Sequence, residues 1–199
     1  MKFSVILTLL FLSLYISVYS QKLSVGFDFG AGASYLGEDI DNENYINFKP
    51  GFTSVIHLKY QPKEAYFGLK FNYQYISTVY EANYWNYPRE GEITTSTTSL
   101  FLEHLNTEKK WALGYFFGMG LTREKIVTYD PYEKLSDVSN FMSIGFGGLL
   151  NHQINENSAL KLTPLALWTD PINTFRPNNY YRGREDISLY MTLGYAYSF

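Results

Sequence analysis

The residues best suited to catalysis or metal binding are the histidines His57, His104 and His152. No two of them have the spacing of a metal-ligand motif, and none has a serine and an acid nearby in a recognisable catalytic pattern. Cysteine is absent, which excludes a thiolate nucleophile, a Cys-ligated metal and a disulfide framework. We therefore predict no catalytic residue, no metal site and no cofactor, and we expect that the protein is not an enzyme.

Charged side chains on otherwise small and polar segments form a stronger candidate site. A charge that enters a low-dielectric interior must be paired, so these residues are predicted to form ion pairs and hydrogen bonds inside the fold. Two interpretations stay open, a network that plugs the interior and a gate whose rearrangement opens a narrow conduit. The predicted network consists of Asp28, Lys59, Lys70, Glu103 and Lys161.

Aromatic residues interleaved with polar ones form a third candidate site, in two segments predicted to be loops. Exposed aromatic rings can stack on sugars or anchor a protein partner. The same rings could instead belong to a membrane-interface girdle with ordinary loop packing. The candidate binding residues are Tyr84, Trp85, Tyr87, Tyr180 and Tyr181.

Composition limits the classes of protein that could carry these sites. The chain has 199 residues, 19% of them aromatic and only 18% charged, which is too aromatic for a disordered chain and poor in charge for a cytosolic one. The net charge of −3 gives a nucleic-acid partner no electrostatic basis. The length suits one domain.

The first twenty residues have the pattern of an export signal. Lys2 precedes an uncharged apolar run over residues 3–18, and Val18-Tyr19-Ser20 ends in the small residue that a signal peptidase reads. We predict a cleaved signal peptide over 1–20 and a single mature domain over 21–199. The alternative is an uncleaved anchor, but the run is short for a membrane-spanning helix.

Period-2 alternation of bulky apolar and small polar residues dominates the rest of the chain, which predicts strands. In the fourth strand we place Leu100 and Leu102 outward and Phe101 and Glu103 inward, although the opposite phase is possible. Pro164 cannot donate to a ladder, so it predicts an irregularity in the seventh. The eight predicted strands cover residues 23–35, 51–60, 67–75, 94–105, 111–121, 142–150, 159–169 and 187–199.

The connections between these strands alternate strictly between long and short. The long ones have about 15 to 18 residues and the short ones about five to seven, so every long loop leaves from the same end of the sheet. An all-antiparallel up-and-down barrel of eight strands produces this order directly, with both termini at the short-turn end. A Greek-key sandwich does not.

Residue size decides which face of the barrel is inside. A soluble barrel would carry many Lys and Glu residues outside, whereas here the polar faces are mostly Gly, Ala, Ser and Thr. Small residues suit a narrow lumen, and bulky apolar ones suit contact with lipid. We therefore predict a transmembrane barrel. Its aromatic girdles are expected at Tyr195, Tyr197 and Phe199 on one rim and at Trp168 and Tyr35 near the other.

The end of the chain carries the most specific motif. Thr192, Gly194, Tyr197 and Phe199 fill the positions of a C-terminal assembly signal that ends in an aromatic residue. With this motif the chain resembles the small bacterial outer-membrane barrels of OmpA/OmpX type, and its use of Tyr, Asn and Lys is similar to that of Bacteroidota proteins. The resemblance implies an outer-membrane location, contact with outer-membrane lipid and lipopolysaccharide, and recognition by the barrel-insertion machinery.

The sequence thus predicts an integral outer-membrane barrel with a structural or surface-binding role, carried by long extracellular loops that bind an unidentified ligand. The first alternative is a small channel for ions or small solutes. The more remote alternative is a lipid-modifying enzyme, for which His104 is the candidate because it lies near a membrane-facing wall.

Overall fold

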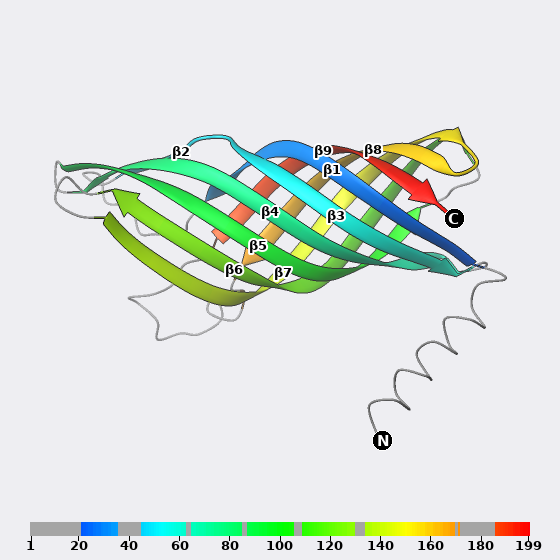
Figure 1. The fold of residues 1–199 in the computed structure, drawn as a ribbon, viewed down its shortest axis with the longest axis horizontal. Coiled ribbons are helices and arrows are strands. Elements are labelled where there is room, and N and C mark those ends of the chain that lie inside the picture. The colour runs from blue at the N-terminus through cyan, green and yellow to red at the C-terminus, as the bar shows by residue number, and fades with distance from the viewer. Residues whose placement is uncertain are drawn as a thin grey trace, which may run out of the picture.

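A computed structural model describes residues 21–35, 45–62, 65–84, 87–105, 109–129, 134–169, 171 and 186–199. The predicted signal peptide over 1–20 lies outside the described residues. The described part forms one elongated barrel, with the C-terminus and the start of β1 at the same end (Figure 1). Within it, no helix is long and apolar enough to cross a membrane.

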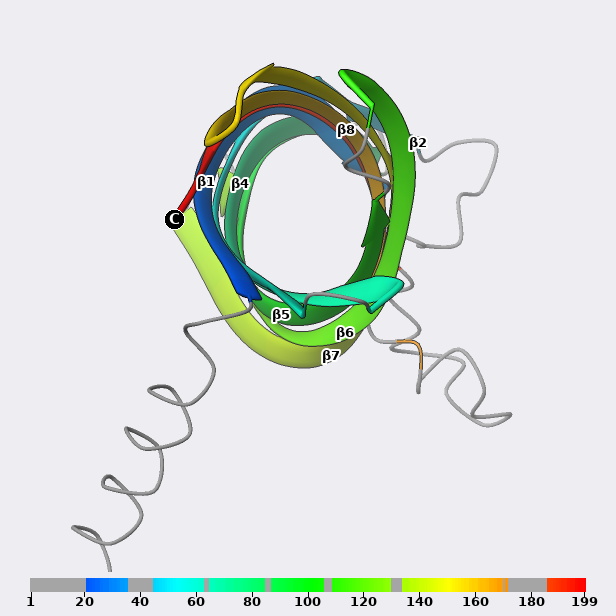
Figure 2. The same cartoon turned by 90° about the vertical axis from the view of Figure 1, so that its right-hand side faces the viewer.

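Antiparallel strands make up the whole barrel. The strands are β1 Gln21–Tyr35, β2 Tyr45–Phe48, β3 Gly51–Pro62, β4 Phe67–Tyr84, β5 Tyr87–Leu105, β6 Trp111–Tyr129, β7 Lys134–Asn155, β8 Ser158–Thr169 and β9 Asp186–Ser198. Each of the eight long strands pairs with its neighbours in the chain, β1 pairs with β9, and the ring is closed (Figure 2). The short β2 lies outside the ring and pairs with the far end of β4. The predicted eight-stranded up-and-down barrel is confirmed.

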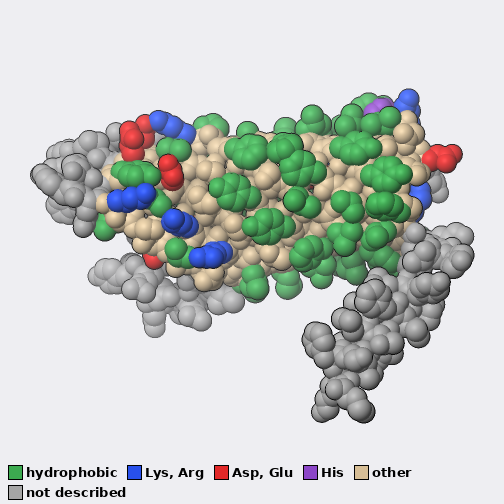
Figure 3. Space-filling view, in the orientation of Figure 1, with side chains coloured by type: hydrophobic (Ala, Val, Ile, Leu, Met, Phe, Trp, Pro, Cys, Tyr) green, Lys and Arg blue, Asp and Glu red, His purple; other side chains and the backbone are tan. Residues whose placement is uncertain are grey.

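Bulky apolar side chains cover the outside of this ring and short polar ones line the inside, as the alternation predicts. The outward rings of Phe29, Phe71 and Phe117 are each about half exposed, whereas the inward Thr53 and Thr97 have no exposed surface. Exposed apolar side chains occur on all eight long strands and form a belt. Figure 3 shows one face of this belt, between the charged end and the terminal end. Strand closure satisfies the backbone in lipid, and this belt faces it.

The predicted long loop over 79–93 is wrong, and so is the predicted loop of about 18 residues before Met142. Strands β4 and β5 stay paired as far as Tyr84↔Tyr87, and β6 and β7 as far as Tyr129↔Lys134. The inward residues Ile76, Tyr80 and Ile93 continue the alternation. The outward positions become mostly polar beyond the belt, so the sequence there lacks the contrast between faces that predicts a strand. We call this extension the crown: β2, residues 78–84, 87–94 and 122–129, and residues 134–142 of β7.

The crown is an open sheet above the closed barrel. Beyond Ser143↔Thr169, the described part of β7 pairs only with β6. Charged side chains gather on the crown, at the end opposite the termini (Figure 3). Lys49 lies beside it and forms an ion pair with Glu81 of β4, and this hydrogen bond raises the pKa of the Lys49 ammonium group.

Burial shows which side chains point inward in the two less certain strands. In β8 these are Lys161 and Thr163. Phe101 and Glu103 point inward, and Leu100 and Leu102 point outward, as predicted. Around Pro164 the ladder between β7 and β8 is interrupted between Gly147↔Leu165 and Leu150↔Leu162, with no change of register. The irregularity predicted for Pro164 is therefore a gap in the ladder, and no bulge occurs there.

Glycines in the wall make room for large inward side chains from neighbouring strands. A Cβ atom on Gly26 would lie 2.2 Å from Nε2 of His57, and one on Gly118 would lie 2.8 Å from the ring of Phe101. A Cβ atom on Gly194 would meet the carboxylate of Asp28. Each of these glycines lets a side chain from another strand lie flat against the wall. The lumen is therefore filled by large side chains that extend across the glycines.

Candidate functional site

Glu103 is the centre of the buried charges in the lumen. Its carboxylate oxygens lie 2.8 Å from Nζ of Lys59 and 3.3 Å from Nζ of Lys70, and all three side chains are almost fully buried. The ammonium group of Lys70 also lies 5.1 Å from the ring centre of Phe116, within reach of a cation–π contact. One carboxylate therefore joins two neighbouring strands, β3 and β4, to β5.

Asp28 is paired with a histidine and not with a lysine. Its carboxylate lies 3.3 Å from Nδ1 of His57, and both residues are buried. Sequence reasoning placed Asp28 in the lumen but left His57 out of the network. The available signal was the position of His57 on the polar face of its strand, next to Gly26 on the paired strand.

Lys161 departs from the expectation that every buried charge is paired. The structure places it in the lumen with 4% of its surface exposed, yet no carboxylate of the described residues lies within ion-pair distance of its Nζ. Its partners in the sheet are Asn151 on β7 and Gly194 on β9, neither of which carries a charge. The lumen therefore holds all five predicted charged residues, but the described contacts join them in two separate groups and leave Lys161 outside both.

Apolar side chains fill the rest of the cross-section. Phe101, Phe116 and Leu165 form one cluster, and the rings of the two phenylalanines meet edge to face at 5.1 Å. Ile76, Leu167 and Tyr190 form a second cluster nearer the crown. Phe101, Leu167 and Glu103 expose at most 1% of their surface, so solvent does not reach these side chains in the middle of the lumen.

A further acid on the lumen wall was missed by the sequence. Glu124 of β6 is 2% exposed and lies on the inward face where the barrel passes into the crown. The predicted strand ended at Leu121, so Glu124 was counted as a loop residue. Its alternation with Thr122 was the signal that could have placed it inside.

The predicted loop-binding aromatics are only partly described. Tyr84 and Tyr87 are paired at the tip of the β4–β5 hairpin and belong to strands, although their side chains are not among those described. Trp85, Tyr180 and Tyr181 lie outside the described residues. Their role in binding stays a prediction.

The residues of the predicted assembly signal lie on β9 and just after it. Thr192 and Gly194 face the lumen, whereas Tyr197 and Phe199 face outward at the terminal rim, 40% and 72% exposed. The backbone N–H of Phe199 donates to the carbonyl of Leu23 at 2.8 Å, which ties the last residue to β1. Recognition of this segment by insertion machinery stays a prediction.

The other two histidines belong to the aromatic girdle at the terminal rim. His104 lies 5.1 Å from the ring of Tyr115, and His152 lies 4.1 Å from the ring of Trp111. Nδ1 of His104 is within hydrogen-bond distance of the carbonyl of Tyr66, at 2.7 Å. Packing between rings accounts for both positions.

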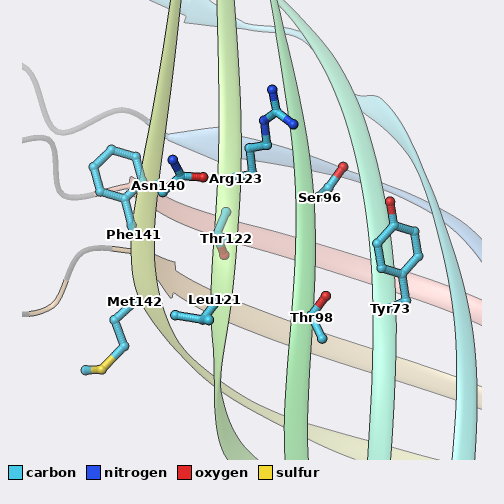
Figure 4. Close-up of a pocket in the computed structure, with 9 residues that line it drawn as sticks. All are labelled: Tyr73, Ser96, Thr98, Leu121, Thr122, Arg123, Asn140, Phe141 and Met142. Carbon is cyan, nitrogen blue, oxygen red and sulfur yellow. The ribbon is translucent and has the colours of Figure 1, made fainter.

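A hollow of 520 Å³ lies on the outer face of β4–β7, where the apolar belt meets the crown. The small side chains of Ser96 and Thr98 on β5 line the bottom of the hollow, between Tyr73 on one side and Leu121 on the other (Figure 4). Arg123 stands at the crown end of the hollow. The site therefore combines apolar sides, formed by Tyr73, Leu121 and Met142, with a guanidinium group at the level where the belt ends.

No family model matches the chain, and no curated protein matches it in sequence. Solved structures match it along nearly its whole length. Neisserial surface protein A (NspA) is 11% identical over 89% of this chain and 97% of its own, with a TM-score of 0.53. OprG from Pseudomonas aeruginosa is 9% identical over 90% and 96%, with a TM-score of 0.56. Ail of Yersinia pestis is 11% identical over 90% and 99%, with a TM-score of 0.54.

These likenesses show the fold of the chain, a closed barrel of the small outer-membrane class. The resemblance to the OmpA/OmpX type is thus confirmed at the level of fold, and it supports an outer-membrane location together with the apolar belt. The likeness to Bacteroidota proteins stays a prediction.

The lumen charges give a matched pair of variants. Glu103→Gln leaves two lysines beside a neutral amide and should destabilise the barrel by about 3–5 kcal/mol, since it removes one partner of a buried ion-pair group. Lys161→Met removes a charge that has no ion pair and keeps most of the side-chain volume, so stability should be unchanged or higher. Urea unfolding of both variants in the same lipid checks the ranking. Equal losses in the two would show that ion pairing does not stabilise the lumen.

Proposed function

We propose that the protein is a closed outer-membrane scaffold whose crown is a binding surface outside the cell, without enzymatic activity. The filled lumen is the observation that carries this proposal. Because the middle of the lumen is occupied by side chains, the outer surfaces are the parts of the barrel best placed to bind a ligand. The short turns and both termini face the periplasm in this orientation, as the resemblance to small outer-membrane barrels implies. The crown then rises from the outer leaflet.

The structure offers little support for the channel alternative. A channel would need a continuous wet path, whereas apolar clusters and the Glu103 ion pairs occupy the middle of the barrel. Opening it would require these clusters and ion pairs to separate together.

The crown has the properties of a recognition surface. Its β4–β5 and β6–β7 hairpins are rigid paired strands that carry exposed charges of both signs, among them Glu90, Glu92, Arg123 and Lys125. The comparison structures include Ail with the heparin analogue sucrose octasulfate. For the present chain this makes a sulfated glycan a reasonable probe among others.

The hollow beside Arg123 supports a second contact, with outer-membrane lipid. Its apolar sides suit an acyl chain. A guanidinium group binds phosphate through two parallel hydrogen bonds. An anionic lipid such as lipopolysaccharide offers both groups. We propose that this hollow holds one such lipid in the outer leaflet.

Conductance tests whether the lumen is closed. The barrel reconstituted in a planar bilayer should give no discrete current steps, because the filled cross-section has no water path. A known porin in the same chamber serves as the positive control, and a heat-sensitive gel mobility verifies that the barrel is folded. Reproducible current steps from folded protein would favour the channel.

Shortening the crown tests the binding surface. Because Val79 and Glu92 are paired, residues 80–91 can be replaced by Asn-Gly to make a two-residue hairpin turn. Cells that display this variant should keep the folded barrel but bind immobilised glycans and matrix proteins at least tenfold more weakly than cells with the wild type. Undiminished binding would place the recognition surface elsewhere.

Arg123→Ala tests the lipid site. Native mass spectrometry should show at least threefold less anionic lipid retained by this variant, with retention of zwitterionic lipid unchanged. Lys109→Ala, in a turn at the opposite end of the barrel, is the matched control and should retain lipid as the wild type does. If both variants lose anionic lipid equally, general surface charge explains the retention and the hollow does not.

A further inference from the structure

The lumen opens at the terminal end into a cavity of 390 Å³, which we call the vestibule. Most of the residues that line it are polar, and it reaches inward as far as Lys59 and Lys161 in the middle of the barrel. The residues that matter for its chemistry are Lys22, Lys59, Asn151, Glu156 and Lys161. Three ammonium groups and one carboxylate therefore line a space large enough for several water molecules, at about 30 Å³ each.

Lys161 is the lining residue whose charge is least balanced. It is 4% exposed, and no carboxylate of the described residues lies within ion-pair distance of its Nζ. Lys59, in contrast, is held by Glu103 at 2.8 Å. The positive charge of an ammonium group in this position is balanced either by distant carboxylates or by an anion that enters through the vestibule.

The count of buried charges points in the same direction. The inner part of the lumen holds the lysines Lys59, Lys70 and Lys161 and the carboxylates of Asp28 and Glu103. Taking the imidazole of His57 as neutral, three positive charges against two negative ones leave this inner group with an excess of +1. The buried carboxylate of Glu124 does not belong to the group, since it lies beside Thr95 at the crown end of the barrel. One bound anion would balance the group.

Asn151 provides a hydrogen-bonding partner at the same place. It is opposite Lys161 in the β7–β8 register, so the two side chains leave the wall side by side. Asn151 is 1% exposed, and its Oδ1 has no hydrogen-bond partner in the structure. Because the oxygen and nitrogen of an asparagine amide exchange places by a simple flip, this side chain can offer N–H donors to an anion.

We propose that the vestibule is a binding site for a small oxyanion, a phosphate or a carboxylate, held by Lys161 and Asn151. The ammonium group supplies charge and the amide supplies a directed hydrogen bond. Lys59 lies on the same wall and adds to the positive potential. The ligand enters from the terminal end of the barrel and does not cross the filled middle of the lumen.

Titration calorimetry on the full barrel in zwitterionic detergent tests this site, with inorganic phosphate and with succinate at constant ionic strength. We expect saturable binding at one site for at least one of these anions, and the comparison tells phosphate from carboxylate recognition. Lys161→Met should weaken binding at least tenfold. Lys109→Met, an exposed lysine outside the vestibule, should bind as the wild type does.

Asn151→Asp is a second and independent variant. It places a carboxylate beside Lys161, so the barrel carries its own anion and should fold normally while binding to added phosphate or succinate is lost. The proposal is overturned if the wild type shows no saturable binding of either anion. It is also overturned if Lys161→Met or Asn151→Asp, verified as folded by heat-sensitive gel mobility, binds as tightly as the wild type.

Discussion

The interior of an eight-stranded barrel is too narrow to stay empty, and a charge buried there is costly unless it is paired. These two constraints govern the rest of the structure. Large side chains such as Phe101 and His57 fill the lumen only because glycines on neighbouring strands leave room for them. The same dry interior requires Glu103 to lie between two lysines. Short residues on one strand thus leave room for long residues on the next. The long side chains both fill the lumen and bring opposite charges together.

The outer face follows the opposite rule, because lipid replaces water as its solvent. All backbone groups in the belt must be bonded between strands, so closure of the ring by β1 and β9 is obligatory there. Above the belt water can satisfy an open edge, and the ring gives way to the open sheet of the crown. The boundary between these regimes passes beside Leu121 and Arg123, where outward side chains change from apolar to charged within two residues.

Much of this architecture could be predicted from the sequence, since a strand with two different solvents on its two faces shows a strict period of two. That period gave the eight barrel strands and the inward positions of all five lumen charges. It failed for the crown, where the outward positions become mostly polar while the inward ones stay buried, so the period loses its contrast in hydropathy. The pairing of Asp28 with His57 could not be predicted either, because it depends on the register between strands, and neither residue is near the other in the chain. The missing ion pair of Lys161 has the same origin.

The hairpin form of the crown has a consequence for how this surface can vary between related proteins. Residues in β4 and β5 face each other in pairs along an unbroken register, from the belt to Tyr84↔Tyr87. Adding or removing two residues on each strand at the tip keeps every other side chain on its inward or outward face. Such a change alters the height of the crown and leaves the barrel below unaltered. The crown can therefore change in height while the wall of the barrel stays under the constraint of its filled interior.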